Sequence, residues 1–65
     1  MKVQEVEAGK IIRTIIFGCP GNYYRVYGMT HWGKVRARRQ FTQEVVYLHP
    51  TVKCEVQTEP VEGFN

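Results

Sequence analysis

The chain has 65 residues, a formal net charge of +3 at pH 7 and six glutamates, but no serine and no aspartate. This length limits it to one small domain, near the lower bound for a chain that folds alone. The missing serine and aspartate exclude a Ser-His-Asp triad, and the longest apolar run, 11–17, is too short to span a bilayer.

β-Branched and aromatic residues, which are typical of strands, recur in five short segments along the chain. We predict strands at residues 10–17, 23–27, 34–40, 44–48 and 52–57. The glycine- and proline-rich segment 18–22 predicts a loop, and segment 28–33, bracketed by glycines, predicts a hairpin turn. Pro50 separates the last two strands because proline cannot donate to a β-ladder. Since no segment shows a helical stripe, we predict an all-β fold.

Five short strands favour a partly closed barrel, because closure removes the exposed edges of a small sheet. A three-stranded meander, then a short break at 49–51 before a last strand, resembles a small SH3-like barrel. We predict one five-stranded domain over residues 1–57, either a partly closed SH3-like barrel or a strongly twisted antiparallel sheet. An extended or mobile tail follows over 58–65. The resemblance rests on strand count and loop placement, and it implies no function by itself.

Charge is segregated along the chain. Seven basic residues and no acidic one lie between Ala8 and Gln43: Lys10, Arg13, Arg25, Lys34, Arg36, Arg38 and Arg39. All the glutamates lie outside this stretch, at Glu5, Glu7, Glu44, Glu55, Glu59 and Glu62. Such segregation is typical of an electrostatic footprint for nucleic acid.

Alternation along the second and third predicted strands assigns their faces. Burying charge is costly, so the apolar set should face the core: Tyr24, Val26, Val35 and Ala37. Basic and aromatic side chains then share the outer face of one hairpin and its tip, where they can neutralise phosphates and stack on unpaired bases. The predicted nucleic-acid-binding residues are Tyr23, Arg25, Tyr27, His31, Trp32, Lys34, Arg36 and Arg38. Single-stranded DNA or RNA fits such a surface best, and duplex DNA remains open.

Plainer interpretations fit the same residues. Charged outer faces are ordinary on β-sheets, the tyrosines fit cross-strand packing over arginine stems, and Trp32 also fits a plug at the edge of the core. The alternative function is a protein-interaction module, a small regulator or inhibitor that docks on an acidic protein or adds an edge strand to another sheet. A homodimer through an edge strand belongs to the same alternative.

The spacing of the cysteines and histidines does not favour a metal site or a catalytic site. Cys19, His31, His49 and Cys54 follow the spacing Cys-x11-His-x17-His-x4-Cys, which lacks the close pair that nucleates a zinc site. An enzyme built on Cys19, with a histidine as base, is a third hypothesis, but no further residue is placed to orient that base. We predict no catalytic site, no metal and no cofactor.

The first residues lack the apolar region of a secretory signal, so we predict a cytoplasmic protein that does not enter a membrane. Cys19 and Cys54 are then free thiols. In a secreted protein, one disulfide between them would instead close a long loop and staple the fold.

Overall fold

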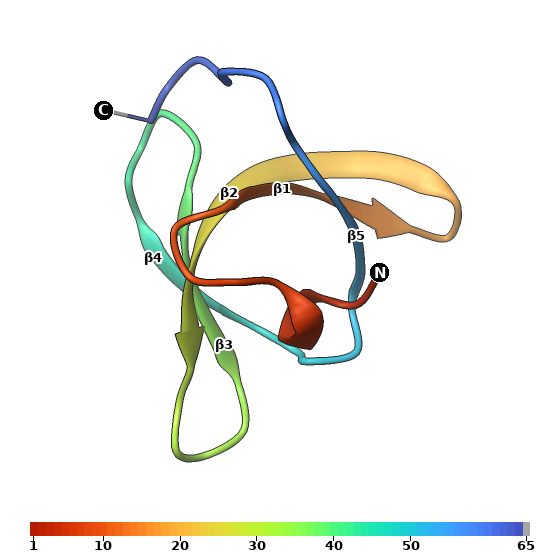
Figure 1. The fold of residues 1–65 in the computed structure, drawn as a ribbon, viewed down its shortest axis with the longest axis vertical. Helices are drawn as coiled ribbons and strands as arrows, with labels where there is room; N and C mark the ends of the chain where they lie inside the picture. The colour runs from red at the N-terminus through yellow and green to blue at the C-terminus, as the bar shows by residue number, and fades with distance from the viewer. Residues whose placement is uncertain (65) are drawn as a thin grey trace.

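The computed structural model describes residues 1–64 and contains one five-stranded antiparallel sheet (Figure 1). Its elements are the 3₁₀ turn η1 (Val3–Glu5) and the strands β1 (Ile11–Ile16), β2 (Cys19–Met29), β3 (Val35–Arg39), β4 (Val45–Leu48) and β5 (Lys53–Val56). The strand order is β4-β3-β2-β1-β5, so the first four strands form a meander and β5 returns to the free side of β1. The predicted all-β fold and the five strands are confirmed.

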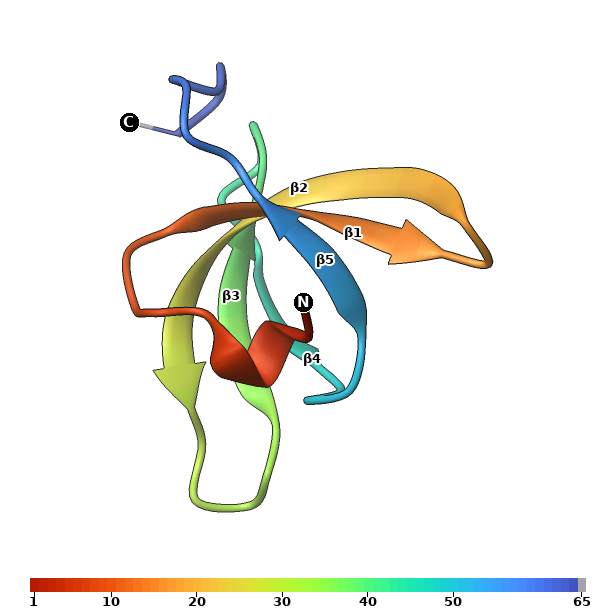
Figure 2. The same ribbon diagram turned by 45° about the vertical axis from the view of Figure 1, so that its right-hand side comes forward.

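The sheet curls strongly but does not close. Strands β4 and β5 are its two edges, and no ladder joins them within residues 1–64. The amino-terminal segment lies inside the curl (Figures 1 and 2), where Val3 N–H donates to Val52 O over 2.9 Å and Cys54 N–H donates to Met1 O over 2.8 Å. The predicted barrel is therefore not confirmed, because the two edge strands do not pair and the sheet stays open.

The core lies on the concave side of the sheet. Tyr24, Val26, Val35 and Ala37 are all buried, with exposed fractions of 8% or less. Strands β2 and β3 pair as a hairpin in which Val26 faces Ala37, so both pack on the same side. The predicted inward face of this hairpin is confirmed. The remaining core residues are Val3, Ile12, Thr14 and Cys54.

The connection between the first two strands differs from the predicted loop at 18–22. The turn consists of Phe17 and Gly18, whose φ angles are 51° and 77°, and β2 begins at Cys19. Two consecutive positive φ angles are those of a tight two-residue hairpin turn. Pro20 is tolerated in β2 because β3 pairs only from Tyr24 onward, which leaves one edge of β2 free at this point.

Gly21 allows β1 and β2 to approach closely. A Cβ atom at this position would lie 2.5 Å from Thr14 Oγ1 and 3.3 Å from the Thr14 carbonyl oxygen. Thr14 is only 4% exposed, and its hydroxyl donates to Asn22 O over 3.5 Å. Glycine is thus required here for space rather than for an unusual backbone angle.

Gly21→Ala should destabilise the fold by about 1–3 kcal/mol, because the added methyl group overpacks the buried Thr14. Urea unfolding followed by circular dichroism measures the change. Asn22→Ala, at an exposed neighbouring position, is the control and should change stability far less. The double variant Thr14→Ala/Gly21→Ala should be more stable than the sum of the single effects predicts. Equal stabilities of Gly21→Ala and the control would contradict this packing.

The two thiols should differ in reactivity. Cys19 is exposed, whereas burial raises the pKa of the Cys54 thiol above its ordinary value of 9.0. Since the thiolate is the reactive form, a thiol reagent at pH 8 should modify Cys19 rapidly and Cys54 only when the fold opens. Cys54 ionises first in the unfolded chain, so stability should also fall as the pH rises past about 9. Equal labelling rates in the native protein, measured by mass spectrometry, would contradict the burial.

Candidate functional site

The outer side of β2, β3 and β4 carries a surface that we call the basic face. It consists of Arg25, Tyr27, Trp32, Arg36, Arg38 and Tyr47. Cross-strand pairing sets its layout, because Arg25 lies opposite Arg38, and Arg36 lies between Gly28 and Tyr47. Residues directly opposite each other point to the same side of a sheet. The apolar partners on the concave side therefore fix these side chains outward.

Among residues 1–64, the arginines of the basic face have no acidic partner. Arg25 and Arg38 are directly opposite each other, an arrangement of like charges that destabilises a strand pair. Within residues 1–64 the single ion pair is Arg39–Glu44, at 3.8 Å, and no carboxylate lies within 4 Å of Arg25, Arg36 or Arg38. The Nε atom of Arg25 is buried and has no hydrogen-bond partner in this part of the chain. The face therefore holds a cluster of uncompensated positive charge.

Aromatic rings stack on these arginines instead. The pairs are Arg38 over Tyr27 at 5.6 Å, Arg36 over Tyr47 at 5.9 Å and Arg25 over Phe64 at 5.5 Å. Such cation–π contacts attract the guanidinium groups to the rings without neutralising their charge. The N–H edges of a stacked guanidinium stay available to anions such as phosphate.

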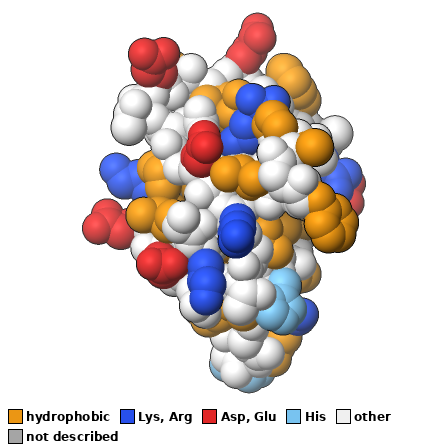
Figure 3. Space-filling view, turned by 90° about the vertical axis from the view of Figure 1, so that its right-hand side faces the viewer, with side chains coloured by type: hydrophobic (Ala, Val, Ile, Leu, Met, Phe, Trp, Pro, Cys, Tyr) orange, Lys and Arg blue, Asp and Glu red, His pale blue; other side chains and the backbone are white. Residues whose placement is uncertain are grey.

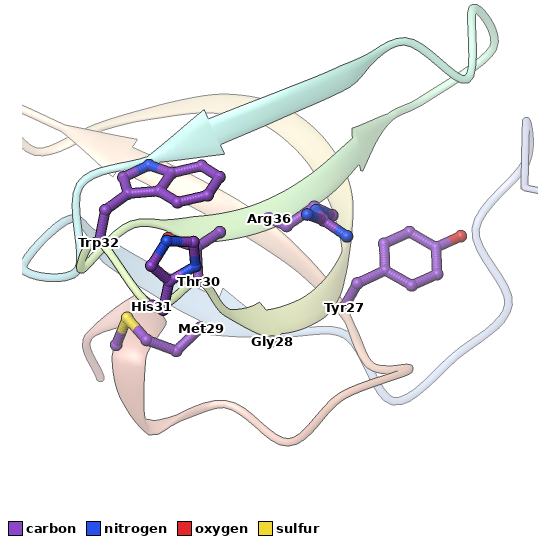
Figure 4. A pocket seen from close by; sticks show the side chains of 7 residues that line it. All are labelled: Tyr27, Gly28, Met29, Thr30, His31, Trp32 and Arg36. Atoms are coloured by element: carbon purple, nitrogen blue, oxygen red, sulfur yellow. The ribbon is translucent and has the colours of Figure 1, made fainter.

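A bulge in β2 interrupts the outer face. The register shifts between Val26 and Gly28, which inserts Tyr27 as an extra residue. Gly28 adopts a φ of 131°, and a Cβ atom placed on it would meet nothing within 4 Å. Arg36 therefore has no side chain opposite it on β2. A hollow of about 270 Å³ lies here, between Tyr27 and Trp32 (Figure 4).

Trp32 stands at the tip of the β2–β3 hairpin and is 53% exposed. Its ring lies 5.5 Å from the ring of Tyr47 at a tilt of 52°, and 4.9 Å from the His31 ring in an edge-to-face contact. The turn is closed by Lys34 N–H, which donates to Thr30 Oγ1 over 3.0 Å. The indole is thus held in place while about half of it faces solvent.

The structure brings together most of the predicted binding residues. Those on or beside the basic face are Arg25, Tyr27, His31, Trp32, Arg36 and Arg38. Lys34 is half-buried in the hairpin turn, just before β3. Tyr23 precedes Arg25 by two residues on the same face of β2, and it pairs with Arg13 of β1, whose guanidinium carbon lies 5.0 Å from the centre of its ring. Arg13 in turn lies opposite Glu55 of β5.

Two aromatic residues of the site were not predicted. Tyr47 belongs to the fourth strand, and the alternation of that strand would have placed it outward if the β3–β4 pairing had been considered. Phe64 reaches Arg25 because Gly63 O accepts hydrogen bonds from Phe41 N–H, at 3.1 Å, and from Gln43 Nε2, at 2.6 Å. The carboxyl-terminal segment is thus tied to the β3–β4 turn, a long-range contact that no local pattern indicates.

The other side of the molecule differs in character. Figure 3 views the side toward which the β1–β2 hairpin extends, and there acidic and basic side chains are interspersed with hydrophobic ones. Within residues 1–64, no three histidine, cysteine or glutamate side chains gather as a metal site requires. The same residues form no helix that is long and apolar enough to cross a membrane.

Comparison with protein-family models, with curated proteins and with solved structures found no match.

Tyr47→Ala should release Trp32, because the tilted contact between the two rings is lost. Trp32 is the single tryptophan of the chain, so its emission reports this directly. We expect lower fluorescence anisotropy and stronger quenching by acrylamide, while circular dichroism stays unchanged. Tyr47→Phe keeps the ring and is the matched control. Identical emission from Tyr47→Ala and the control would show that Tyr47 does not position the indole.

Proposed function

We propose that this chain is a small nucleic-acid-binding module, which acts by binding and without catalysis or a cofactor. The observation that carries the proposal is the placement of Arg25 directly opposite Arg38, with Arg36 nearby and, within residues 1–64, no carboxylate within 4 Å of any of them. Like charges in register oppose each other, and the stacked rings beside them carry no compensating charge. A polyanion bound across the strands would supply it.

The aromatic rings favour single strands over a duplex. Phosphates of either form would bind the arginine N–H edges, and this contribution is independent of sequence. Tyrosine and tryptophan rings offer flat surfaces for bases, but only unstacked bases can reach them. We therefore propose single-stranded DNA or RNA as the preferred ligand, bound with low sequence specificity. Duplex DNA bound through its backbone is the weaker alternative.

A protein partner is the second candidate, and the edge strand β4 favours it. Its outer edge has no partner strand within residues 1–64, and Val45 and Tyr47 are 40% and 48% exposed. The strand carries no charged residue or proline that would block pairing with another chain. A regulator or inhibitor of this kind would add β4 to a partner's sheet or to a second copy of itself. Saturable protein binding without affinity for oligonucleotides would distinguish it.

We also propose a cytoplasmic setting and a partly closed, SH3-like arrangement of the strands. The two cysteines are free, and an exposed thiol such as Cys19 persists best in a reducing compartment. The meander of four strands, with β5 beside β1, supports the SH3-like arrangement.

Arg36→Ala/Arg38→Ala should weaken the binding of a labelled single-stranded oligonucleotide at 50 mM salt by at least about tenfold, because hydrogen bonds to charged groups contribute about 1.5–3 kcal/mol each. Each phosphate contact makes the slope of log K against log salt concentration more negative by about 0.7. The slope should therefore be about 1.4 shallower in the double variant. Fluorescence anisotropy between 50 and 200 mM salt measures both effects.

Lys2→Ala/Lys10→Ala is the matched control. It removes the same charge from two exposed positions outside the basic face, so it should weaken binding much less and leave the slope nearly unchanged. Circular dichroism must show that both variants are folded. Equal losses in the two variants would attribute binding to net charge alone, and no binding by the wild type at low salt would refute the proposal.

A further inference from the structure

We infer that the hollow beside Trp32 is a subsite for one unstacked base of a single-stranded nucleic acid. The inference rests on the proposed function, and it adds a specific role for one end of the basic face. Tyr27 and Trp32 flank the hollow, Gly28 and Arg36 lie between them, and its volume is about 270 Å³ (Figure 4).

The size and opening of the hollow suit one base. Sites for drug-sized ligands span about 300–1,000 Å³, so this space is suited to a single flat ring system rather than to a larger group. It lies beside Gly28, which has no side chain, at the bulge where Tyr27 is the extra residue. Open space above Gly28 leaves the hollow accessible from solvent.

The chemistry of the lining matches a nucleotide. Trp32 offers the largest π-face of any side chain, and bases stack on such faces regardless of their identity. Its contacts with Tyr47 and His31 hold the indole before a ligand arrives, which lowers the entropic cost of binding. Arg36 lies over the Tyr47 ring and also lines the hollow, so it brings positive charge to the hollow. A base in the hollow would therefore have its phosphate within reach of a guanidinium group.

This arrangement predicts selectivity for unpaired bases. A paired base must be unstacked before it can enter such a site, at a cost of a few kcal/mol. Trp32 lies at the tip of a hairpin rather than on a broad surface, so it can reach one base of a flexible strand. Duplexes would contact only the arginines.

The test compares oligothymidylate with an abasic oligonucleotide of the same length and charge, each titrated by fluorescence anisotropy. The wild type should bind the base-containing strand about tenfold more tightly, in line with the effect of one stacked base. Trp32→Ala should lose most of this difference, and it should bind the abasic strand with the affinity and the salt dependence of the wild type. Trp32→Phe should retain part of it. Emission of Trp32 in the wild type should be quenched by oligothymidylate and not by the abasic strand.

Phe17→Ala is the matched control, because it removes a fully exposed aromatic ring from the opposite hairpin tip. It should bind both strands as the wild type does. The titrations are repeated with oligouridylate and an abasic RNA strand. Tighter binding of the base-containing strand than of the abasic strand, in either DNA or RNA, supports the inference.

Two negative results are distinguishable. Salt-dependent binding in which Trp32→Ala retains the full preference for bases would overturn the base subsite and leave the proposed function intact. Absence of salt-dependent binding by the wild type to any strand would overturn the proposed function and the subsite together. Circular dichroism of Trp32→Ala, and the partial effect of Trp32→Phe, separate a binding defect from a folding defect.

Discussion

The pairing register of β2 and β3 determines both the core and the outer surface. Val26 faces Ala37 in this register, and both are completely buried. The same pairing forces Arg25 and Arg38 outward and opposite each other. A slip by one residue would bury arginines and expose the apolar set, so core burial enforces the register. The like-charge contact on the outside is thus tolerated because the inside cannot be arranged otherwise.

A single bulge in β2 produces the hollow on this otherwise regular surface. Perfect alternation would place a side chain opposite Arg36 and fill the outer face evenly. The bulge at Tyr27 and the glycine that follows remove that side chain, and bulges commonly redirect side chains near functional sites. The regular part of the hairpin therefore supplies the positive charge, and the bulge supplies the hollow.

Sequence patterns could predict the parts of the fold that depend on neighbours along the chain. Alternation was sufficient to assign Tyr24, Val26, Val35 and Ala37 to the core. Composition was misleading at residues 18–22, because a free strand edge accommodates Pro20 and close packing requires Gly21. The contacts of Tyr47 and Phe64 join segments distant in sequence, and the open edges of the sheet depend on where the amino terminus packs. None of these follows from local periodicity, so the aromatic half of the site was only partly predictable.

The two ends of the basic face are not equivalent. At one end Phe64 covers Arg25, held there by hydrogen bonds between Gly63 and the β3–β4 turn. At the other end the hollow beside Trp32 is open. A flexible strand that places a base in the hollow would run along Arg36 and Arg38, toward a position where an aromatic ring already occupies the face of the guanidinium. Under the proposed function, bases would therefore be accommodated best at the hairpin tip, whereas phosphates would be neutralised along the whole hairpin.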